Sequence, residues 1–177
     1  MKQFGGPAAF IDRNDINTDE IIPAKYLTEI TKKALAPHLL EDLRLEGGEF
    51  DPHSAEMQAA RVLVTRANFG CGSSREHAVW ALEVNDINVV IGESFARIFR
   101  QNMINCGILA VELSRADIDR LFALKNGPVT VTVDLDAEQL TATSSTGETV
   151  TCRFTLNPFD KQLIGAGGWL AYADAKY

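Results

Sequence analysis

Three short apolar runs in the middle of the chain alternate with segments whose apolar residues recur at three- and four-residue spacing. The runs cover residues 61–65, 88–91 and 108–113 and are rich in branched aliphatic side chains. On the helical faces of the intervening segments lie Ala78, Ala81 and Leu82, then Phe95, Ile98 and Phe99. This βαβαβ pattern predicts parallel strands joined by right-handed crossover helices, the second of which ends at Gly107.

The C-terminal part of the chain follows another pattern. A helix is expected to begin at Ser114, whose side chain can cap the backbone N–H of Asp117. Past Gly127, the stretches VTVTVD, QLTAT and TVTCRF alternate apolar and polar residues, and the turn residues SSTGE join the last two. They predict an antiparallel sheet with a hairpin. In the C-terminal segment PFDKQLIGAGGWLAY we expect short helices that are interrupted at Gly165, Gly167 and Gly168.

The first 60 residues are less regular. Residues 8–11 have the composition of a strand, 12–30 that of an ordered loop, and 46–56 that of an exposed connection. A helix beginning at Pro37 would turn Leu39, Leu40 and Leu43 toward the core. Together these elements predict an α/β fold, as one three-layer β/β/α domain spanning residues 1–177, with a mainly parallel sheet, flanking helices and antiparallel C-terminal strands.

Composition narrows the range of functions. The 177 residues are 46% hydrophobic and carry a formal net charge of −7, which disfavours nucleic-acid binding because such surfaces need clustered lysine and arginine. Neither a signal peptide nor an apolar run of membrane length is evident, so we expect a soluble, cytoplasmic protein. The three cysteines, Cys71, Cys106 and Cys152, are far apart, so we expect neither a disulfide framework nor a metal site on this chain.

The segment NFGCGSSREHA, residues 68–78, connects the first apolar run to the first crossover helix. Its simplest explanation is structural, with Ser73 and Glu76 forming a capping box. A dinucleotide-binding loop is a second possibility, because GCGSSR begins like G-x-G-x-x-G. Against it, Arg75 replaces the third glycine and no acidic residue ends the second strand at the expected place.

A third possibility is an anion-binding catalytic site. The free N–H groups of a helix N-terminus, together with Arg75, favour a carboxylate or a developing oxyanion beside Ser73. No histidine stands at a spacing diagnostic of a Ser-His-Asp relay, and the G-x-S-x-G pattern is missing from this segment. Hydrolysis by a serine nucleophile is therefore disfavoured.

The same segment, with IGESFARIFRQNMINCGILAVEL downstream and NTDEIIPAKYL upstream, resembles the small subunits of 3-isopropylmalate dehydratases, the free-standing counterparts of the swivelling domain of aconitases. The resemblance implies a hydro-lyase that isomerises 2-isopropylmalate to 3-isopropylmalate by dehydration and rehydration, a step of leucine biosynthesis. It also implies a partner, a large subunit carrying a [4Fe-4S] cluster, and hence a heterodimer or heterotetramer that is active only when assembled.

By this resemblance Ser73 corresponds to the catalytic base, Arg75 to the arginine that binds a substrate carboxylate, and Ser74 to a substrate-binding residue. Asp19 corresponds to an aspartate of the active-site region. A serine hydroxyl is a weak acid, and an arginine about 4 Å away contributes only about 4 kcal/mol at an effective dielectric constant near 20. A helix N-terminus adds about 1 kcal/mol. The rest of the electrostatic stabilisation that an ionised serine needs must therefore come from the partner.

The loop KYLTEI, residues 25–30, corresponds to the segment that contacts the variable group of the substrate. In aconitases and homoaconitases an arginine there pairs with an additional carboxylate. Thr28 offers no charge, so a substrate with an apolar branch is expected. Lys25, Lys32 or Lys33 could compensate, which keeps homoaconitase as an alternative, and 2,3-dimethylmalate would meet the same argument as isopropylmalate. A non-catalytic carboxylate-binding module is a further alternative, because it would need the same Arg75 and helix N-terminus. His77 is expected to form a hydrogen bond within the fold.

Overall fold

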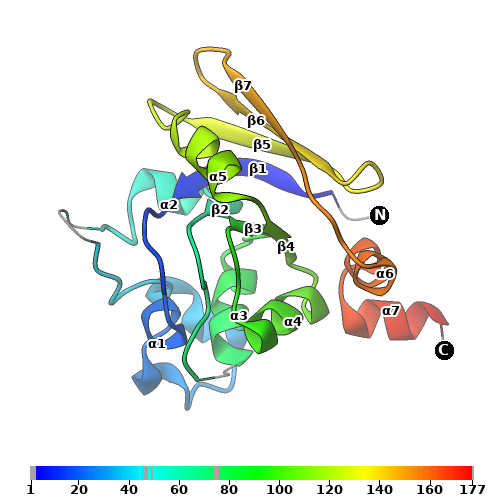
Figure 1. Cartoon of the computed structure of the whole chain (residues 1–177). Coiled ribbons are helices and arrows are strands. Elements are labelled where there is room, and N and C mark those ends of the chain that lie inside the picture. Colours follow the sequence, from blue (N-terminus) through cyan, green and yellow to red (C-terminus); the bar gives the residue numbers. More distant parts are fainter. Residues whose placement is uncertain (1–2, 46–47, 49, 74–75, 177) are drawn as a thin grey trace.

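The computed structural model describes residues 3–45, 48, 50–73 and 76–176. Its centre is a seven-stranded sheet in the order β4-β3-β2-β1-β5-β6-β7 (Figure 1). The parallel strands are β1 (Gly5–Phe10), β2 (Val62–Val64), β3 (Val89–Gly92) and β4 (Leu109–Glu112). The antiparallel strands are β5 (Val129–Asp134), β6 (Gln139–Ser144) and β7 (Thr149–Arg153).

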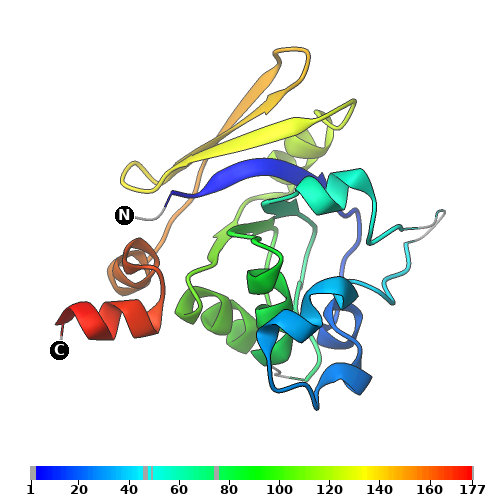
Figure 2. The ribbon, with the colours of Figure 1, turned by 180° about the vertical axis from the view of Figure 1, so that it is seen from behind.

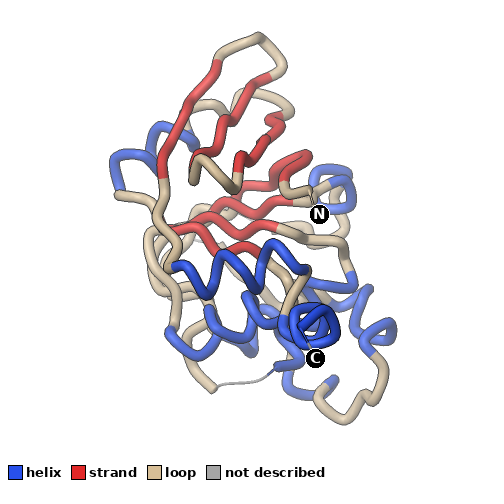
Figure 3. The backbone as a smooth tube through the Cα atoms, turned by 90° about the vertical axis from the view of Figure 1, so that its right-hand side faces the viewer, coloured by secondary structure: helices blue, strands red, loops and turns tan. Residues whose placement is uncertain are grey.

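Strand β1 joins the two parts of the sheet. Its second half pairs with β2 in parallel, in the register Ala8 to Val62, and its first half pairs with β5 in antiparallel, in the register Pro7 to Thr130. One strand therefore belongs to both halves, and the two sheets expected from sequence form a single curled sheet. In Figure 3 the strands lie in the upper and middle parts of the molecule, with most helices below them.

Helices and short 3-10 segments connect these strands. Between β1 and β2 lie α1 (Thr18–Ile21), η1 (Ala24–Tyr26), η2 (Lys32–His38) and α2 (Ala55–Ala59). The crossovers to β3 and β4 are α3 (Glu76–Val84) and α4 (Arg97–Asn105). The remaining helices are α5 (Arg115–Phe122), α6 (Pro158–Ala166) and α7 (Trp169–Lys176).

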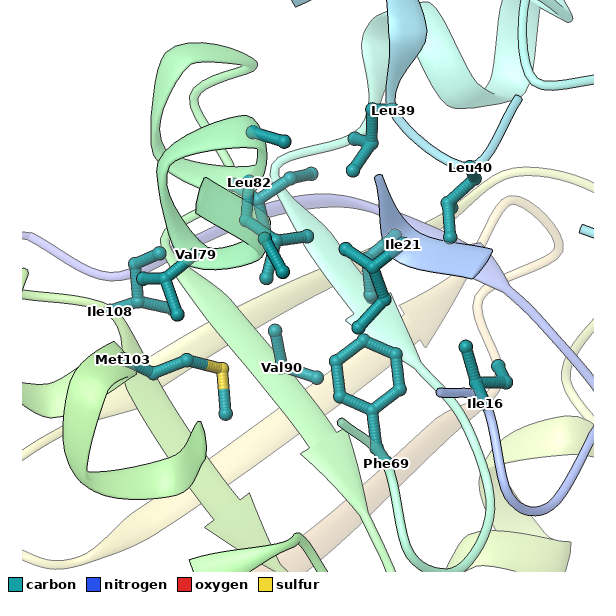
Figure 4. Packing of buried hydrophobic residues seen from close by; sticks show 14 of the residues in the cluster. Ile16, Ile21, Leu39, Leu40, Phe69, Val79, Leu82, Val90, Met103 and Ile108 are labelled. Atoms are coloured by element: carbon teal, nitrogen blue, oxygen red, sulfur yellow. The ribbon is translucent and has the colours of Figure 1, made fainter. Parts of the chain in front are cut away.

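Alternation along the strands separates two apolar cores. Leu63 and Val90 face one core. This core also contains buried residues of α4, of the segment before α2, and of α3, where Leu82 is an example (Figure 4). Val64 and Ile91 face the opposite core, which includes residues of α5, α6 and β5 to β7. The curled antiparallel strands thus form a layer of their own, which gives the predicted β/β/α arrangement (Figure 2).

Most of the predicted elements are confirmed, because apolar runs and helical spacing describe buried faces well. Ser114 caps α5 by accepting a hydrogen bond from the N–H of Asp117 at 3.2 Å. Gly107 follows α4 with a φ of 81°, as expected of a helix end. One position of the predicted α4 face is wrong, since Ile98 is 58% exposed while Phe99 is buried.

Two further details differ from expectation. The turns around Pro37 begin earlier, as the 3-10 helix Lys32–His38, because buried Leu35 packs these turns against the core; Leu39, Leu40 and Leu43 are buried as predicted. Gly165 lies inside α6 and does not break it. The chain leaves α6 at Gly167, because this residue adopts a left-handed conformation that lets the N–H of Gly168 bond to the carbonyl of Leu163 and so close the helix.

Candidate active site

The segment that leads to Ser73 is held by residues far away in the sequence. The N–H of Gly70 donates to the carbonyl of Ile16 at 2.8 Å, and the N–H of Thr18 donates to the carbonyl of Cys71 at 2.9 Å. The hydroxyl of Thr18 donates to the carbonyl of Ser73 at 2.8 Å, across 55 positions of sequence. Residues 16–18 and 70–73 therefore run side by side as a short parallel pairing.

Helix α1 begins inside this pairing and carries Asp19 in its first turn. Asn17 caps the helix: its side-chain oxygen accepts from the N–H of Glu20 at 3.0 Å, and its own N–H donates to the Glu20 carboxylate at 3.3 Å. The sequence N-x-x-E is a capping-box signal that the interpretation of this region as a loop missed. Asp19 directly follows Thr18, which contacts Ser73, so Asp19 and Ser73 come to the same part of the surface.

Arg13 fixes the approach to this helix. Its guanidinium forms a two-pronged ion pair with Glu20 and donates to the carbonyl of Arg44 at 2.9 Å. The hydrogen bond to Glu20 raises the pKa of Arg13 above its ordinary value, against the opposing effect of burial. The side chain is therefore a permanent cation that ties residues 13–20 together.

Ser73 itself is exposed, as are Asp19 and Thr28. It precedes α3, whose first described residue is Glu76, so it lies near the N-terminal end of that helix. Two of the predicted site residues, Ser74 and Arg75, lie outside the described residues. The predicted capping box of Ser73 and Glu76 spans these two residues, so it stays a prediction. Ser73 and Asp19 are therefore both exposed, and the hydrogen bond from Thr18 joins the segments that carry them.

The glycines of GCG have backbone explanations. Gly70 has a φ of 84°, and a Cβ added there would lie 2.3 Å from the ring of Phe99. Gly72 has a φ of 91°, also in the left-handed region. These constraints account for both residues without any dinucleotide. They also explain how the chain turns from Phe69, which is buried in the core (Figure 4), to Ser73, which is exposed.

Cys71 is half-buried between the two glycines. Burial raises the pKa of its thiol, and the negative charge of Asp15 raises it further. The thiol is therefore protonated near neutral pH and is a poor nucleophile. Its carbonyl, which accepts from Thr18, is the part of the residue that shapes the site.

The loop at residues 25–30 lies beside the start of α3. His77, in the first turn of α3, donates from Nε2 to the carbonyl of Glu29 at 3.3 Å, which confirms that this histidine bonds within the fold. Helix α1 also contacts α3. Ser73 and the 25–30 loop thus both lie near the N-terminal end of α3, the helix that α1 also contacts.

A charged cleft with a volume of about 980 Å³ lies at the carboxyl ends of the parallel strands, and neither Ser73 nor Asp19 lines it. Its charged lining is Arg13, Arg44, Arg66, Arg115, Asp12, Asp15, Glu93 and Asp119. Arg66 pairs with Asp12 at 2.8 Å and also with Asp119, and the lining holds as many carboxylates as guanidinium groups, so it offers no excess of positive charge to a dicarboxylate. We therefore assign the candidate site to the open surface around Ser73.

Within the described ranges no group of three or more histidine, cysteine, aspartate or glutamate residues could hold a metal ion. Cys71 follows β2, Cys106 ends α4 and buried Cys152 lies in β7, so the thiols belong to three separate places. This donor set does not fit an iron–sulfur cluster ligated by this chain. No described helix has the length and apolarity needed to cross a membrane.

Comparison with known proteins gives two matches. Residues 2–116 match the family model described as the aconitase C-terminal domain. The fold is similar to the crystal structure of 3-isopropylmalate dehydratase (LeuD) from Methanocaldococcus jannaschii, with a TM-score of 0.76 and 29% sequence identity. The match covers 99% of this chain and 95% of that one.

Proposed function

The chain belongs to the aconitase C-terminal domain family, and from this premise we propose that it is the small subunit of a 3-isopropylmalate dehydratase. The assembled enzyme would isomerise 2-isopropylmalate to 3-isopropylmalate by dehydration and rehydration, in leucine biosynthesis in the cytoplasm. The observation that carries the proposal is the placement of exposed Ser73 beside the segment of Asp19, held by the bond from Thr18.

In this proposal Ser73 removes the proton from the carbon next to a substrate carboxylate, and returns it to the neighbouring carbon during rehydration. Arg75 binds a carboxylate and stabilises the serine oxyanion, and Ser74 contributes a substrate hydrogen bond. Asp19 belongs to the proton or positioning network of the same site. An exposed serine at the end of a helix supports this assignment, because the helix N-terminus favours the charged form of the base.

The chain alone does not supply enough positive potential for a serine base. An arginine at about 4 Å and a helix N-terminus contribute about 5 kcal/mol together, which leaves the hydroxyl a weak acid. We therefore propose a partner, a large subunit with a [4Fe-4S] cluster that acts as a Lewis acid toward the substrate hydroxyl. This chain would bind and orient the carboxylates and move the proton, and the partner would cover the open surface around Ser73.

Reconstitution tests the proposal directly. The purified chain should show no hydratase activity toward 2-isopropylmalate, and activity should appear when an iron–sulfur large subunit is added anaerobically. Co-purification with that subunit, measured by size-exclusion chromatography, is the accompanying physical observation. Turnover by the isolated chain, or a failure of the two chains to associate, would contradict the proposed division of labour.

The proposed substrate preference makes Thr28 a testable position. Thr28→Arg should raise kcat/KM of the reconstituted enzyme for a homoaconitate-type substrate by about tenfold and lower it for isopropylmalate, because a desolvated carboxylate would gain a charged partner. Thr149→Arg, the same change at an exposed position of β7, is the control. Unchanged preference in Thr28→Arg would remove the 25–30 loop from substrate selection.

A further inference from the structure

The 25–30 loop is fixed at its first end by a cluster of three side chains. The ring of Tyr26 stacks on that of His38, with centroids 3.8 Å apart and an angle of 14° between the planes. The Tyr26 hydroxyl donates to Glu41 at 2.8 Å, and Nδ1 of His38 lies 3.3 Å from the same carboxylate. Hydrogen bonds from both rings lower the pKa of Glu41 against the opposing effect of its partial desolvation, so its carboxylate is ionised.

The second end of the loop is attached to α3. The carbonyl of Glu29 accepts from Nε2 of His77, and the His77 ring packs against Trp80 with centroids 4.6 Å apart. The ammonium group of Lys32 also lies over the Trp80 ring, 5.6 Å from its centre. The same group forms an ion pair with the carboxylate of Glu83 at 3.0 Å. Two residues of the loop region therefore contact consecutive turns of α3.

Between these attachments the side chains point away from the fold. Thr28 is exposed, and Ile30 is 93% exposed. The backbone beneath them is nevertheless ordered by turns, since the N–H of Leu27 donates to Ala24 and the N–H of Glu29 donates to Tyr26, both at 3.1 Å. The loop thus presents its variable side chains on a backbone that is held from both ends.

We propose that His77 is a positioning residue, which ties the backbone of the 25–30 loop to the helix that follows Ser73 and so sets the distance between the substrate-selecting side chains and the base. The ion pair of Lys32 and Glu83 is exposed and contributes little by itself. The hydrogen bond to a backbone carbonyl is the directional contact, because it fixes one loop atom relative to the first turn of α3. The role of the loop in substrate selection rests on the proposed function. The hydrogen bond between His77 and Glu29 does not depend on it.

Hydrogen exchange on the isolated chain tests the attachment without requiring turnover. In His77→Ala the amides of Leu27 and Glu29 should exchange about fivefold faster, the effect expected from loss of one hydrogen bond. His77→Gln, whose side-chain N–H can reach the same carbonyl, should restore slow exchange. His53→Ala, at an exposed histidine before α2, should leave these amides unchanged. Equal exchange in His77→Ala and the unmodified chain would overturn the proposal.

The functional consequence is read on the reconstituted enzyme. His77→Ala should raise KM for isopropylmalate about fivefold and change kcat less than about twofold, because the base and the carboxylate-binding residues are untouched. His77→Gln should restore KM. A fall in kcat without a change in KM would contradict a positioning role. If the enzyme shows no isopropylmalate activity at all, the proposed function fails while the exchange experiment still decides whether His77 holds the loop.

Discussion

Replacement of Ser73 by alanine is expected to reduce turnover of the reconstituted enzyme about 1000-fold, while substrate affinity changes by less than about threefold. The magnitude is that of removing a general base from a proton transfer. Affinity is retained because carboxylate binding is assigned to Arg75 and to the partner, and the hydroxyl of Ser73 is asked to act only in the proton-transfer step. Turnover is measured by isopropylmaleate absorbance, and binding by calorimetry with isopropylmalate.

The fold should survive this change. Ser73 is exposed, and its contact with Thr18 uses the backbone carbonyl, which alanine keeps. The midpoint of thermal unfolding should therefore stay within about 1 °C of the unmodified chain. Ser145→Ala, at an exposed position in the β6–β7 turn, is the matched control and should leave both turnover and stability unchanged. Unimpaired turnover in Ser73→Ala would favour a non-catalytic carboxylate-binding module.

Strands and crossover helices were predictable because each buries a face that its own sequence displays. Val89 to Ile91 form a run of buried residues, as expected of a parallel strand covered on both sides. In α3 the predicted inward residues Ala78 and Leu82 are buried. Such patterns are local, so a single sequence is enough to predict the elements and their order.

The assembly of the site was less predictable, because it depends on pairing between distant segments. Nothing local in NTDE shows that Thr18 will bond to the carbonyl of Ser73. The place of β1 between the parallel and antiparallel halves of one sheet is similarly a property of its neighbours, Val62 on one side and Thr130 on the other. The resemblance to known subunits suggested the candidate site residues, and the structure gives the contacts that join the segments of Ser73 and Asp19.

The glycine pattern shows how one signal can have two physical origins. G-x-G after a strand is expected where a phosphate approaches the backbone, and equally where the backbone must adopt positive φ. Gly70 meets the second condition and also faces the ring of Phe99, so the pattern is explained by packing. Sequence alone could not separate these origins, because Phe99 comes from the second crossover helix.

This packing gives the second large expected effect, on stability. Gly70→Ala should lower the free energy of unfolding by about 3 kcal/mol, combining about 1 kcal/mol for a left-handed alanine with about 2 kcal/mol for overpacking against buried Phe99. For a chain of this size the midpoint of thermal unfolding should fall by about 9 °C. Circular dichroism and urea titration measure the two quantities, and turnover of the assembled enzyme should fall as well, since this backbone leads to Ser73.

Gly147→Ala separates the two contributions. Gly147 has a φ of 91°, close to the 84° of Gly70, but a Cβ added there meets nothing within 4 Å. It should therefore lower the free energy of unfolding by only about 1 kcal/mol, which isolates the backbone cost. The excess cost at Gly70 should shrink when Phe99 is also changed to leucine, because a smaller side chain leaves room for the added methyl group. If the two glycine substitutions are equally destabilising, the close approach of Phe99 does not constrain the segment before Ser73.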